Sequence, residues 1–359
     1  NQNTGYGRTE GGNTRKSLKM LKTAIVILNW NGMDWLQKFL ETTIKHSISS
    51  DTRIYIADNG STDGSQEWAA GNPGITEIIQ LEKNYGFAGG YNRALSRNDA
   101  RYFVLLNSDV EVTEGWLGPL VEYMDNNPET AACQPKIKSY HKRDYFEYAG
   151  AAGGYIDRFG YTFCRGRIFD RIEKDEGQYD TTTDIFWASG ACMMVRSDAW
   201  KKCGGFDDDF FAHMEEIDLC WRFHLAGYSV ACVPESVIYH VGGGSLPYNS
   251  ERKTYLNFRN NLFLLYKNLP ENRLGKIIFQ RKILDGLAAV MLLFKGVPGI
   301  LKAVRNAHRD FNKSIDSLRA KRETVKTLSI GNCDDCLLNI SIVYRFYLRG
   351  QKLFSKLGL

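Results

Sequence analysis

The sequence lacks long hydrophobic runs and a secretory leader. Its 359 residues contain no stretch of about 18 uncharged apolar residues, the length that a bilayer-spanning helix needs. The first nineteen residues are polar and rich in Gly and Asn, without the apolar centre of a signal peptide. We therefore expect no membrane-spanning helix, a flexible leader over residues 1–21 and a cytoplasmic protein.

The sequence also lacks paired metal-binding cysteine motifs and two common nucleotide-binding glycine motifs. Its 8 cysteines are scattered through apolar or helical stretches, which is typical of a reducing compartment. Cys333 and Cys336 have C-x-x-C spacing, but no second cysteine pair or histidine pair accompanies them, so a zinc or redox role is not favoured. No G-K-[ST] follows the glycines of residues 86–90, which excludes a P-loop, and no G-x-G-x-x-G supports a dinucleotide fold.

Charge divides the chain into two parts. Residues 251–359 hold 21 Lys and Arg against 8 Asp and Glu, a net charge of +13, whereas the remainder holds 25 against 33, a net charge of −8. We therefore expect a catalytic or binding domain over residues 22–250 and a basic helical extension over residues 251–359.

Strands, polar loops and helices alternate along the first part. Short apolar runs at residues 24–28, 53–57, 77–81 and 102–106 are each followed by a polar loop, and helical patterns lie between the runs. This order predicts an α/β fold with a mostly parallel sheet. Because the carboxyl ends of such strands line one crevice, the polar side chains after them should converge: Asn31, Asp58, Asn84, Asn92 and Asp109.

The triplet Asn107-Ser108-Asp109 ends the fourth run. Asp109 is thus a candidate metal ligand at the ligand-binding edge of the sheet. A simple turn is the alternative, since Asn, Ser and Asp all favour turns. The repeated glycines of residues 86–90 can similarly let backbone approach a phosphate near a helix start.

An acidic segment and a histidine stand out in the second half of the domain. On a helix, Glu215, Asp218 and Arg222 share one face and can pair, which leaves Glu216 available as a base. A solvated acidic helix end is the alternative reading. His240 ends an apolar strand before the glycines of residues 242–244, where an imidazole can bind a metal and a loop can fold over a ligand.

Eight landmarks in order make residues 22–270 resemble an inverting GT-A glycosyltransferase of family 2, in particular its rhamnosyltransferase-like branch. They lie at residues 27–32, 58–65, 84–92, 105–110, 188–191, 204–207, 215–219 and 239–240. The resemblance implies a GT-A fold, a nucleotide-diphosphate sugar donor, a divalent cation (Mg²⁺ or Mn²⁺) and inversion at the anomeric carbon. Residues 271–359 lie outside it.

The resemblance also assigns roles to residues. Glu216 takes the position of the general base, and Glu215 and Asp218 remain competitors because the family's usual Glu-Asp is Glu-Glu here. Asp109 takes the metal-binding position of the DxD-type motif, whose first acid is replaced by Asn107, so His240 and the donor diphosphate would complete the metal site. The implied donor-binding residues are Asn29, Asn31, Asp58, Asn59, Asn84, Phe87, Gly90, Asn92, Asn107 and Ser108.

The extension reads as helices over residues 256–266, 276–294 and 298–328. Its apolar segment 283–294 is too short to span a bilayer but suits an interfacial helix. The flanking basic residues would meet anionic headgroups: Arg281, Lys282, Lys295, Lys302 and Arg305. We expect residues 276–328 to contact the inner face of the cell membrane; a helical cap on the core is the alternative, and no recognisable nucleic-acid module is present.

These observations lead to one principal hypothesis. The protein would transfer a sugar, with rhamnose from dTDP-rhamnose as the best guess, to a hydroxyl of a glycan or lipid-linked glycan in cell-surface polysaccharide synthesis. A family 2 transferase using a UDP-sugar and a non-catalytic nucleotide-sugar or glycan-binding module are the alternatives. A nucleotidyltransferase would need a basic glycine-rich loop near the N-terminus, which residues 29–32 do not provide.

Overall fold

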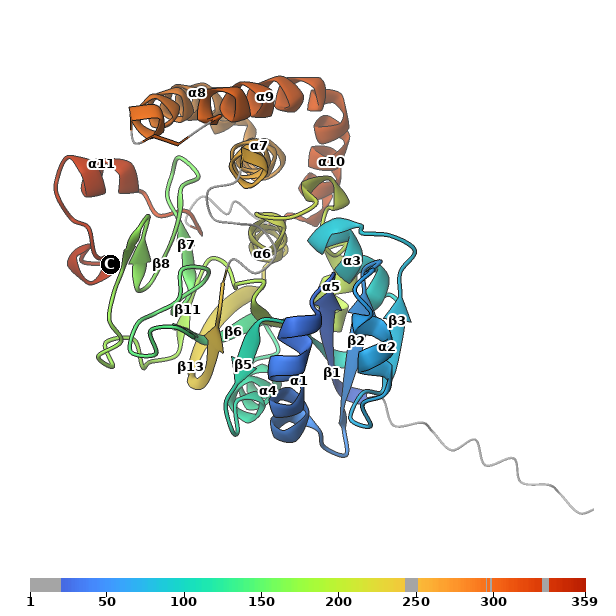
Figure 1. Cartoon of the computed structure of the whole chain (residues 1–359). Coiled ribbons are helices and arrows are strands. Elements are labelled where there is room, and N and C mark those ends of the chain that lie inside the picture. Colours follow the sequence, from blue (N-terminus) through green and yellow to red (C-terminus); the bar gives the residue numbers. More distant parts are fainter. Residues whose placement is uncertain (1–20, 243–250, 295, 298, 331–335) are drawn as a thin grey trace, which may run out of the picture.

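The computed structural model describes residues 21–359 except 243–250, 295, 298 and 331–335. The leader up to residue 20, the glycines from Gly243 and Cys333 therefore lie outside the described residues. A nine-stranded mixed sheet in the order β11-β13-β6-β12-β4-β1-β2-β3, with β5 beside β13, forms the centre of the molecule. A second sheet of four short strands, β10-β9-β8-β7, lies beside it (Figure 1).

The first half of the chain forms the βαβ units that the sequence predicts. Its elements are β1 (Leu21–Asn29), α1 (Met33–Ser47), β2 (Thr52–Asp58), α2 (Ser65–Ala70), β3 (Glu77–Gln80), α3 (Gly86–Leu95), β4 (Ala100–Asn107), β5 (Val110–Val112), α4 (Leu117–Asn126) and β6 (Thr130–Ser139). Strands β1, β2, β3, β4, β6 and β13 run in one direction, and β5, β11 and β12 run in the other. The mostly parallel sheet and its α/β class are confirmed.

The second half completes the sheet and adds the smaller one. Its elements are β7 (Gly154–Ile156), β8 (Thr162–Cys164), β9 (Arg167–Ile168), β10 (Arg171–Ile172), β11 (Thr183–Asp184), β12 (Cys192–Arg196), α5 (Ser197–Lys202), the 3-10 turn η1 (Asp208–Phe210), α6 (Glu215–Leu225) and β13 (Ser229–His240). Thus α6, which carries the acidic segment, precedes the strand that ends in His240.

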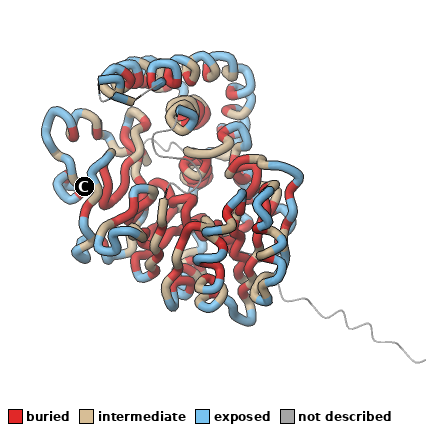
Figure 2. Tube along the Cα trace, in the orientation of Figure 1, coloured by how far each residue is buried: buried red, intermediate tan, exposed pale blue. Residues whose placement is uncertain are grey.

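The sheet is buried on both faces because its inner strands β1 and β4 are apolar through their centres. In β1, Ala24 and Val26 pack on one face with α3, while Ile25 and Ile27 pack on the other with α1. In β4, Phe103 and Leu105 likewise face α3, and Val104 and Leu106 face α1 and α4. This alternation is the side-chain period of a strand, and helices on both faces remove both sets from water (Figure 2).

The extension is helical, as predicted, and packs on the core. It contains α7 (Glu251–Asn268), α8 (Glu271–Phe294), α9 (Ile300–Lys313), α10 (Ile315–Leu328), α11 (Ile342–Tyr347) and the 3-10 turn η3 (Phe354–Lys356). The extension shares one hydrophobic cluster with helices α3 and α6 of the core. Its members in this cluster include Leu262 of α7, Phe311 of α9 and Phe346 of α11. The boundary at residue 250 therefore divides the chain by charge and not by packing.

The expected single helix over residues 298–328 is wrong. The structure divides it at Ser314, which ends α9 with ψ near 0°, and α10 begins at the next residue. The Ser314 hydroxyl donates to the Asp310 carbonyl at 2.9 Å and satisfies a carbonyl at the end of α9. Within the described ranges, no helix is both long enough and apolar enough to cross a membrane.

Candidate active site

The register of β1 and β2 brings Asn29 and Asp58 together. These residues are partners in the parallel ladder and are fully buried. The Asn29 amide donates to Asp58 Oδ1 at 3.3 Å, and Asp58 Oδ2 accepts from the Ser61 N–H at 3.1 Å and from Gln80 Nε2 at 2.9 Å. The Asp58 carboxylate is therefore held rigidly at the carboxyl edge of the sheet, where the sequence places it.

The loop after β1 turns toward the end of β4. Asn31 adopts a left-handed conformation (φ 49°), and its side-chain oxygen accepts from the Thr62 N–H at 2.7 Å. At Gly32, a Cβ would lie 2.4 Å from Asn29 Oδ1 and 3.4 Å from the Ser108 hydroxyl. Glycine therefore lets this loop approach Ser108, so the first and fourth loops converge as predicted.

Two asparagines join the second and third loops. Asn59, which follows Asp58, donates to Asn84 Oδ1 at 3.1 Å and to the Gly86 carbonyl at 3.0 Å. Its own oxygen accepts from the Tyr85 N–H at 3.0 Å. Asn59 and Asn84 thus fix the entry of α3 beside the Asp58 loop.

The glycines of α3 serve packing and not the expected phosphate approach. The N–H groups of Phe87 and Ala88 donate to the Phe211 carbonyl at 2.7 and 3.2 Å, so these donors at the start of α3 are occupied. A Cβ on Gly90 would lie 2.8 Å from Leu28 Cδ1, which means that Gly90 permits close packing of α3 on β1. We therefore withdraw Gly90 as a donor-binding residue.

Asn92 and Phe87 face the loop that leads to α6. Asn92 donates to the Phe206 carbonyl at 2.8 Å and accepts from the Phe206 N–H at 2.9 Å, and it also donates to Asp208 Oδ1 at 2.6 Å. These contacts hold Asn92 against the loop at Phe206, and its place in the donor pocket stays a prediction. The half-buried Phe87 ring packs 4.8 Å from Tyr91 and 5.9 Å from Phe206, measured between ring centroids.

Asp109 and His240 meet because β5 pairs with the end of β13. His240 is the ladder partner of Val110, and the Val241 N–H donates to the Asp109 carbonyl at 3.1 Å. As a result, His240 Nε2 lies 3.2 Å from Asp109 Oδ1, although the two residues are far apart in sequence. The backbone N–H of Asn107 donates to the Ala191 carbonyl at 3.0 Å. The side chain of Asn107 is a neutral amide, so it adds no negative charge beside Asp109.

A third residue, Glu147, completes this pair and was not predicted. Its Oε2 atom lies 3.2 Å from His240 Nδ1, so the imidazole stands between two carboxylates. The Glu147 side chain is 4% exposed. Burial disfavours an imidazolium, but Glu147 and Asp109 outweigh it and raise the pKa of His240 to about 10. The only signal in the sequence is an isolated acid among aromatic residues, Tyr145 to Tyr148.

The donor set fits a divalent cation that has further ligands from elsewhere. Adjacent ligands around an ion with metal–ligand distances of about 2.1 Å are separated by about 3 Å, close to the observed 3.2 Å between Asp109 Oδ1 and His240 Nε2. The described residues contain no group of three or more His, Cys, Asp or Glu that could hold a metal ion. Asp109 and His240 therefore suit a cation that a diphosphate helps to bind and that displaces the proton from His240 Nε2.

The chain enters α6 through strained backbone. Phe211, His213 and Met214 have positive φ angles of 63°, 71° and 75°, a conformation that side-chain-bearing residues rarely adopt. The fully buried Asn260 of α7 compensates, because its amide donates to the carbonyls of Phe210, Ala212 and His213 at 3.0, 2.9 and 2.7 Å. The extension thus holds the segment that presents Glu215 and Glu216.

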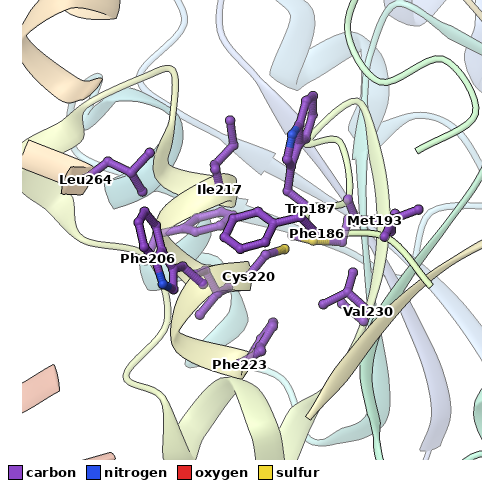
Figure 3. Close-up of a cluster of buried hydrophobic side chains, with 14 of the residues drawn as sticks. Phe186, Trp187, Met193, Phe206, Ile217, Cys220, Phe223, Val230 and Leu264 are labelled. Atoms are coloured by element: carbon purple, nitrogen blue, oxygen red, sulfur yellow. The ribbon is translucent and has the colours of Figure 1, made fainter. Parts of the chain in front are cut away.

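The apolar side of α6 anchors this helix on the sheet. Ile217, Cys220 and Phe223 follow one another at helical spacing and point into a cluster with Phe186 and Met193 (Figure 3). Glu216 stands four residues before Cys220, one helical turn away on the same side of α6, and is only partly buried. The anchored helix thereby gives Glu216 a fixed direction.

Glu216 has the properties of a general base. Its Oε2 atom is buried without a hydrogen-bond partner. Burial, only partly offset by backbone N–H groups at the start of α6, raises the pKa of Glu216 to about 7. A carboxylate with such a pKa can take a proton near neutral pH. Burial and the neighbouring Glu216 charge raise the pKa of Glu215 well above its usual range.

Asp218 is part of a structural ion-pair network and is withdrawn as a base. Its carboxylate is fully buried, and Oδ2 lies 2.8 Å from Arg222 Nη2 and 2.8 Å from Lys267 Nζ. Although burial opposes ionisation, the Lys267 and Arg222 charges hold the pKa of Asp218 below its usual range. The predicted Asp218–Arg222 pair is confirmed. The predicted inclusion of Glu215 is wrong, because Glu215 Oε2 has no hydrogen-bond partner.

A comparison with known families identifies the chain. The sequence profile described as Glycosyl transferase family 2 matches residues 24–204, about half of the sequence. The chain belongs to glycosyl transferase family 2. It is accordingly a glycosyltransferase, and the family resemblance drawn from its motifs is confirmed.

Related family members include two rhamnosyltransferases. The N-acetylglucosaminyl-diphospho-decaprenol L-rhamnosyltransferase of Mycobacterium tuberculosis is 25% identical over 234 residues, which are 60% of this chain and 75% of that protein. Rhamnosyltransferase WbbL of Escherichia coli is 25% identical over 221 residues, or 58% of this chain and 80% of that protein.

Solved structures confirm the GT-A fold of this family 2 chain. The structure of S. aureus TarS 1–349 in complex with UDP-GlcNAc superposes with a TM-score of 0.52 at 13% identity, covering 93% of both chains. GalNAc-T7 with UDP, GalNAc and Mn²⁺ superposes with a TM-score of 0.54 at 14% identity. That superposition covers 70% of this chain but only 48% of GalNAc-T7.

Proposed function

We propose that this protein is an inverting rhamnosyltransferase that uses dTDP-rhamnose and a lipid-linked glycan acceptor in cell-surface polysaccharide synthesis. The observation that carries the inverting reaction is the partly buried Glu216, whose unpartnered Oε2 and pKa of about 7 suit it to deprotonate a hydroxyl. The two rhamnosyltransferase relatives support the sugar, and the printed name of the mycobacterial protein supports a lipid-linked acceptor.

The donor would bind along the carboxyl edge of the sheet. Asp58, held by Ser61 and Gln80, accepts from the pyrimidine base, and the first and fourth loops line the nucleoside and sugar. The proposed lining residues are Asn29, Asn31, Asn59, Asn84, Phe87, Asn107 and Ser108. Hydrogen bonds hold the side chains of Asn31, Asn59 and Asn84 in place, which lowers the entropy cost of binding.

Glu216 would act on the acceptor. Its carboxylate removes the hydroxyl proton as the acceptor oxygen attacks the anomeric carbon, opposite the bond to the departing diphosphate. The new C–O bond forms as the old one breaks, the proton stays on Glu216, and the configuration inverts. Mg²⁺ or Mn²⁺ held by Asp109 and His240 would supply neutralisation of the diphosphate charge. Glu147 keeps the His240 ring oriented toward Asp109.

A donor screen tests the sugar nucleotide. In a thermal-shift assay with Mn²⁺, dTDP-rhamnose should raise the melting temperature more than UDP-GlcNAc or GDP-mannose, because a ligand at 100 times its Kd stabilises by about 2.7 kcal/mol. NMR of the transferred sugar should then show inverted anomeric configuration. Stabilisation by a UDP-sugar alone would favour the UDP-dependent alternative, and donor binding without hydrolysis or transfer would favour a non-catalytic module.

A further inference from the structure

Helix α8 carries a continuous apolar stripe on its solvent side. Large apolar side chains recur at intervals of four or three residues, which places them along one face of the helix. They are Phe279, Ile283, Leu287, Val290 and Phe294, with exposures of 67%, 49%, 62%, 47% and 87%. The stripe spans 15 residue steps, or about 22 Å at about 1.5 Å per residue. An exposed apolar patch of this extent marks an interaction surface.

The opposite face of α8 is charged and buried. Arg281 pairs with Asp285 at 2.7 Å and donates to the Gly160 carbonyl at 3.1 Å, and His308 of α9 lies 3.1 Å from the same aspartate. Arg281 is only 6% exposed, so the expectation that it meets lipid headgroups is wrong. An ordinary surface helix buries apolar residues and exposes charged ones. Helix α8 instead buries the Arg281–Asp285 ion pair and exposes the apolar stripe to water.

A basic pocket borders the stripe. The pocket, of about 540 Å³, is lined by Leu284 of α8 together with Arg158, Tyr344, Arg345 and Arg349. These arginines form no ion pair with a carboxylate in the part of the chain that the structure describes. Arginine binds phosphate through parallel N–H donors, so three of them around a polar pocket suit a phosphate group.

The neighbouring helices limit the extent of this surface. Helices α8 and α9 lie together at the outer end of the molecule, with α7 between α9 and α6 (Figure 1). On α10, by contrast, Lys321 pairs with Asp207 and Asp209, and Arg322 pairs with Glu271. Lys321 and Arg322 are thus neutralised by contacts within the protein. Of the region expected over residues 276–328, the exposed apolar stripe singles out α8 as the surface that contacts a membrane.

We propose that α8 lies in the interface of an anionic phospholipid membrane, with its stripe in the acyl boundary and a lipid phosphate in the pocket of Arg158, Arg345 and Arg349. This proposal rests on the proposed function, because a lipid-linked acceptor must be reached at a membrane. Interfacial helices bind by apolar burial together with electrostatic attraction, and the stripe and pocket supply these two contributions side by side. A second copy of this chain on the stripe is the competing occupant.

Flotation of the full-length protein with vesicles tests the proposal. The wild type should bind vesicles of phosphatidylglycerol and phosphatidylcholine more tightly than vesicles of phosphatidylcholine alone. The double substitution Ile283→Asp/Leu287→Asp should lower the partition coefficient for both vesicles by at least about tenfold. Arg158→Ala/Arg349→Ala should lower it about tenfold on anionic vesicles and less on phosphatidylcholine vesicles, whose phosphate is offset by the choline cation.

Matched controls use exposed residues away from α8. Ile48→Asp at the end of α1, 47% exposed, and Arg97→Ala after α3 should bind vesicles like the wild type. The circular dichroism spectrum and melting temperature check that each variant is folded. The proposal is overturned if the wild type does not float with anionic vesicles, or if sedimentation shows a dimer that the stripe substitutions dissociate while vesicle binding is unchanged.

Donor binding separates this proposal from the proposed function. The thermal shift with dTDP-rhamnose and Mn²⁺ should be the same in the wild type and in the stripe and pocket variants. A wild type that binds donor but not vesicles would contradict only the membrane surface. A wild type that binds vesicles but no sugar nucleotide would contradict only the proposed function.

Discussion

At the scale of single residues, the candidate site depends on carboxylates whose surroundings differ although they are close in sequence. Glu215 is buried with a strongly raised pKa, Glu216 is partly buried with a pKa of about 7, and Asp218 has a lowered pKa beside two cations. Helical spacing places Glu216 and Asp218 on different sides of α6. Only their tertiary contacts explain why the pKa of Glu216 is raised and that of Asp218 is lowered. The three acids of α6 therefore have three different roles.

Glu216→Gln should reduce the rate of transfer by about 10²- to 10⁴-fold, because the amide cannot accept the acceptor proton. Donor affinity, measured by calorimetry, should remain within about twofold, since the base acts on the acceptor. Glu215→Gln is the control and should retain most of the activity. Loss of transfer in Glu215→Gln with retention in Glu216→Gln would reverse the assignment.

The rate of transfer should also depend on pH. The active form of Glu216 is the carboxylate, and its pKa is raised to about 7, so kcat should rise as the pH increases from 6 to 8 and then level off. Because burial sets this raised pKa, the Glu215→Gln variant should keep the same midpoint. Stopped assays across this range measure the profile, and a kcat that falls with pH would contradict it.

Two substitutions test the metal site. Asp109→Asn removes a charged ligand and should weaken Mn²⁺-dependent donor binding, with little change in the binding measured without metal. Glu147→Gln should weaken metal affinity in the presence of dTDP by about 10- to 100-fold, because the ring of His240 loses its orienting carboxylate. Calorimetry with and without Mn²⁺ distinguishes these effects. Equal Mn²⁺ affinity in all three proteins would exclude both roles.

At the scale of elements, α7 supports the active site from outside the matched family profile. Asn260 saturates three carbonyls of a backbone segment that contains positive φ angles immediately before α6. Strain of this kind persists only where the surrounding structure compensates it. The extension is therefore part of the catalytic unit, in addition to any role at a membrane.

Asn260→Leu should lower stability by about 1–3 kcal/mol, since the carbonyls of Ala212 and His213 lose their side-chain donor. The Phe210 carbonyl keeps the guanidinium of Arg259 as a donor. The substitution should also lower kcat while leaving donor Kd nearly unchanged. The reason is that residues 210–214, which lead into α6, would no longer hold the side chain of Glu216 in position. Asn261→Leu is the matched control: Asn261 is equally buried but donates to Gly160, so this variant should lose stability and keep kcat. Equal kcat losses in both variants would indicate a purely structural effect.

At the scale of the whole molecule, the C-terminal segment closes over the smaller sheet. Asp157 accepts from the N–H groups of Phe159, Tyr161 and Ile342, each at 2.9 Å, and so joins α11 to the turn between β7 and β8. Phe354 packs on Tyr155, Phe163 and Tyr179 of the same region. This closure also forms the arginine pocket, because Arg158 follows Asp157 and Arg345 lies on α11.

Asp157→Ala should release the C-terminal segment, because three N–H groups lose their acceptor and that of Ile342 is buried. Limited proteolysis followed by mass spectrometry should show cleavage after residue 335 at least about tenfold faster than in the wild type. Asp170→Ala in the same part of the chain, where the carboxylate is 69% exposed, is the control. Unchanged cleavage in Asp157→Ala would show that the aromatic contacts of Phe354 suffice.

The sequence by itself determined the α/β class, the family and the edge of the sheet that carries the site. Asn29, Asp58 and Asp109 could be placed there because each follows an apolar run, and parallel strands end at one common edge. Only the tertiary structure decided which polar residues are available to a ligand. Asp218 and Arg281 look functional in sequence but are saturated by partners, many of them more than 40 residues away. Glu147 and Asn260 acquire their roles in the same way, because hydrogen-bond partners are set by packing and not by local pattern.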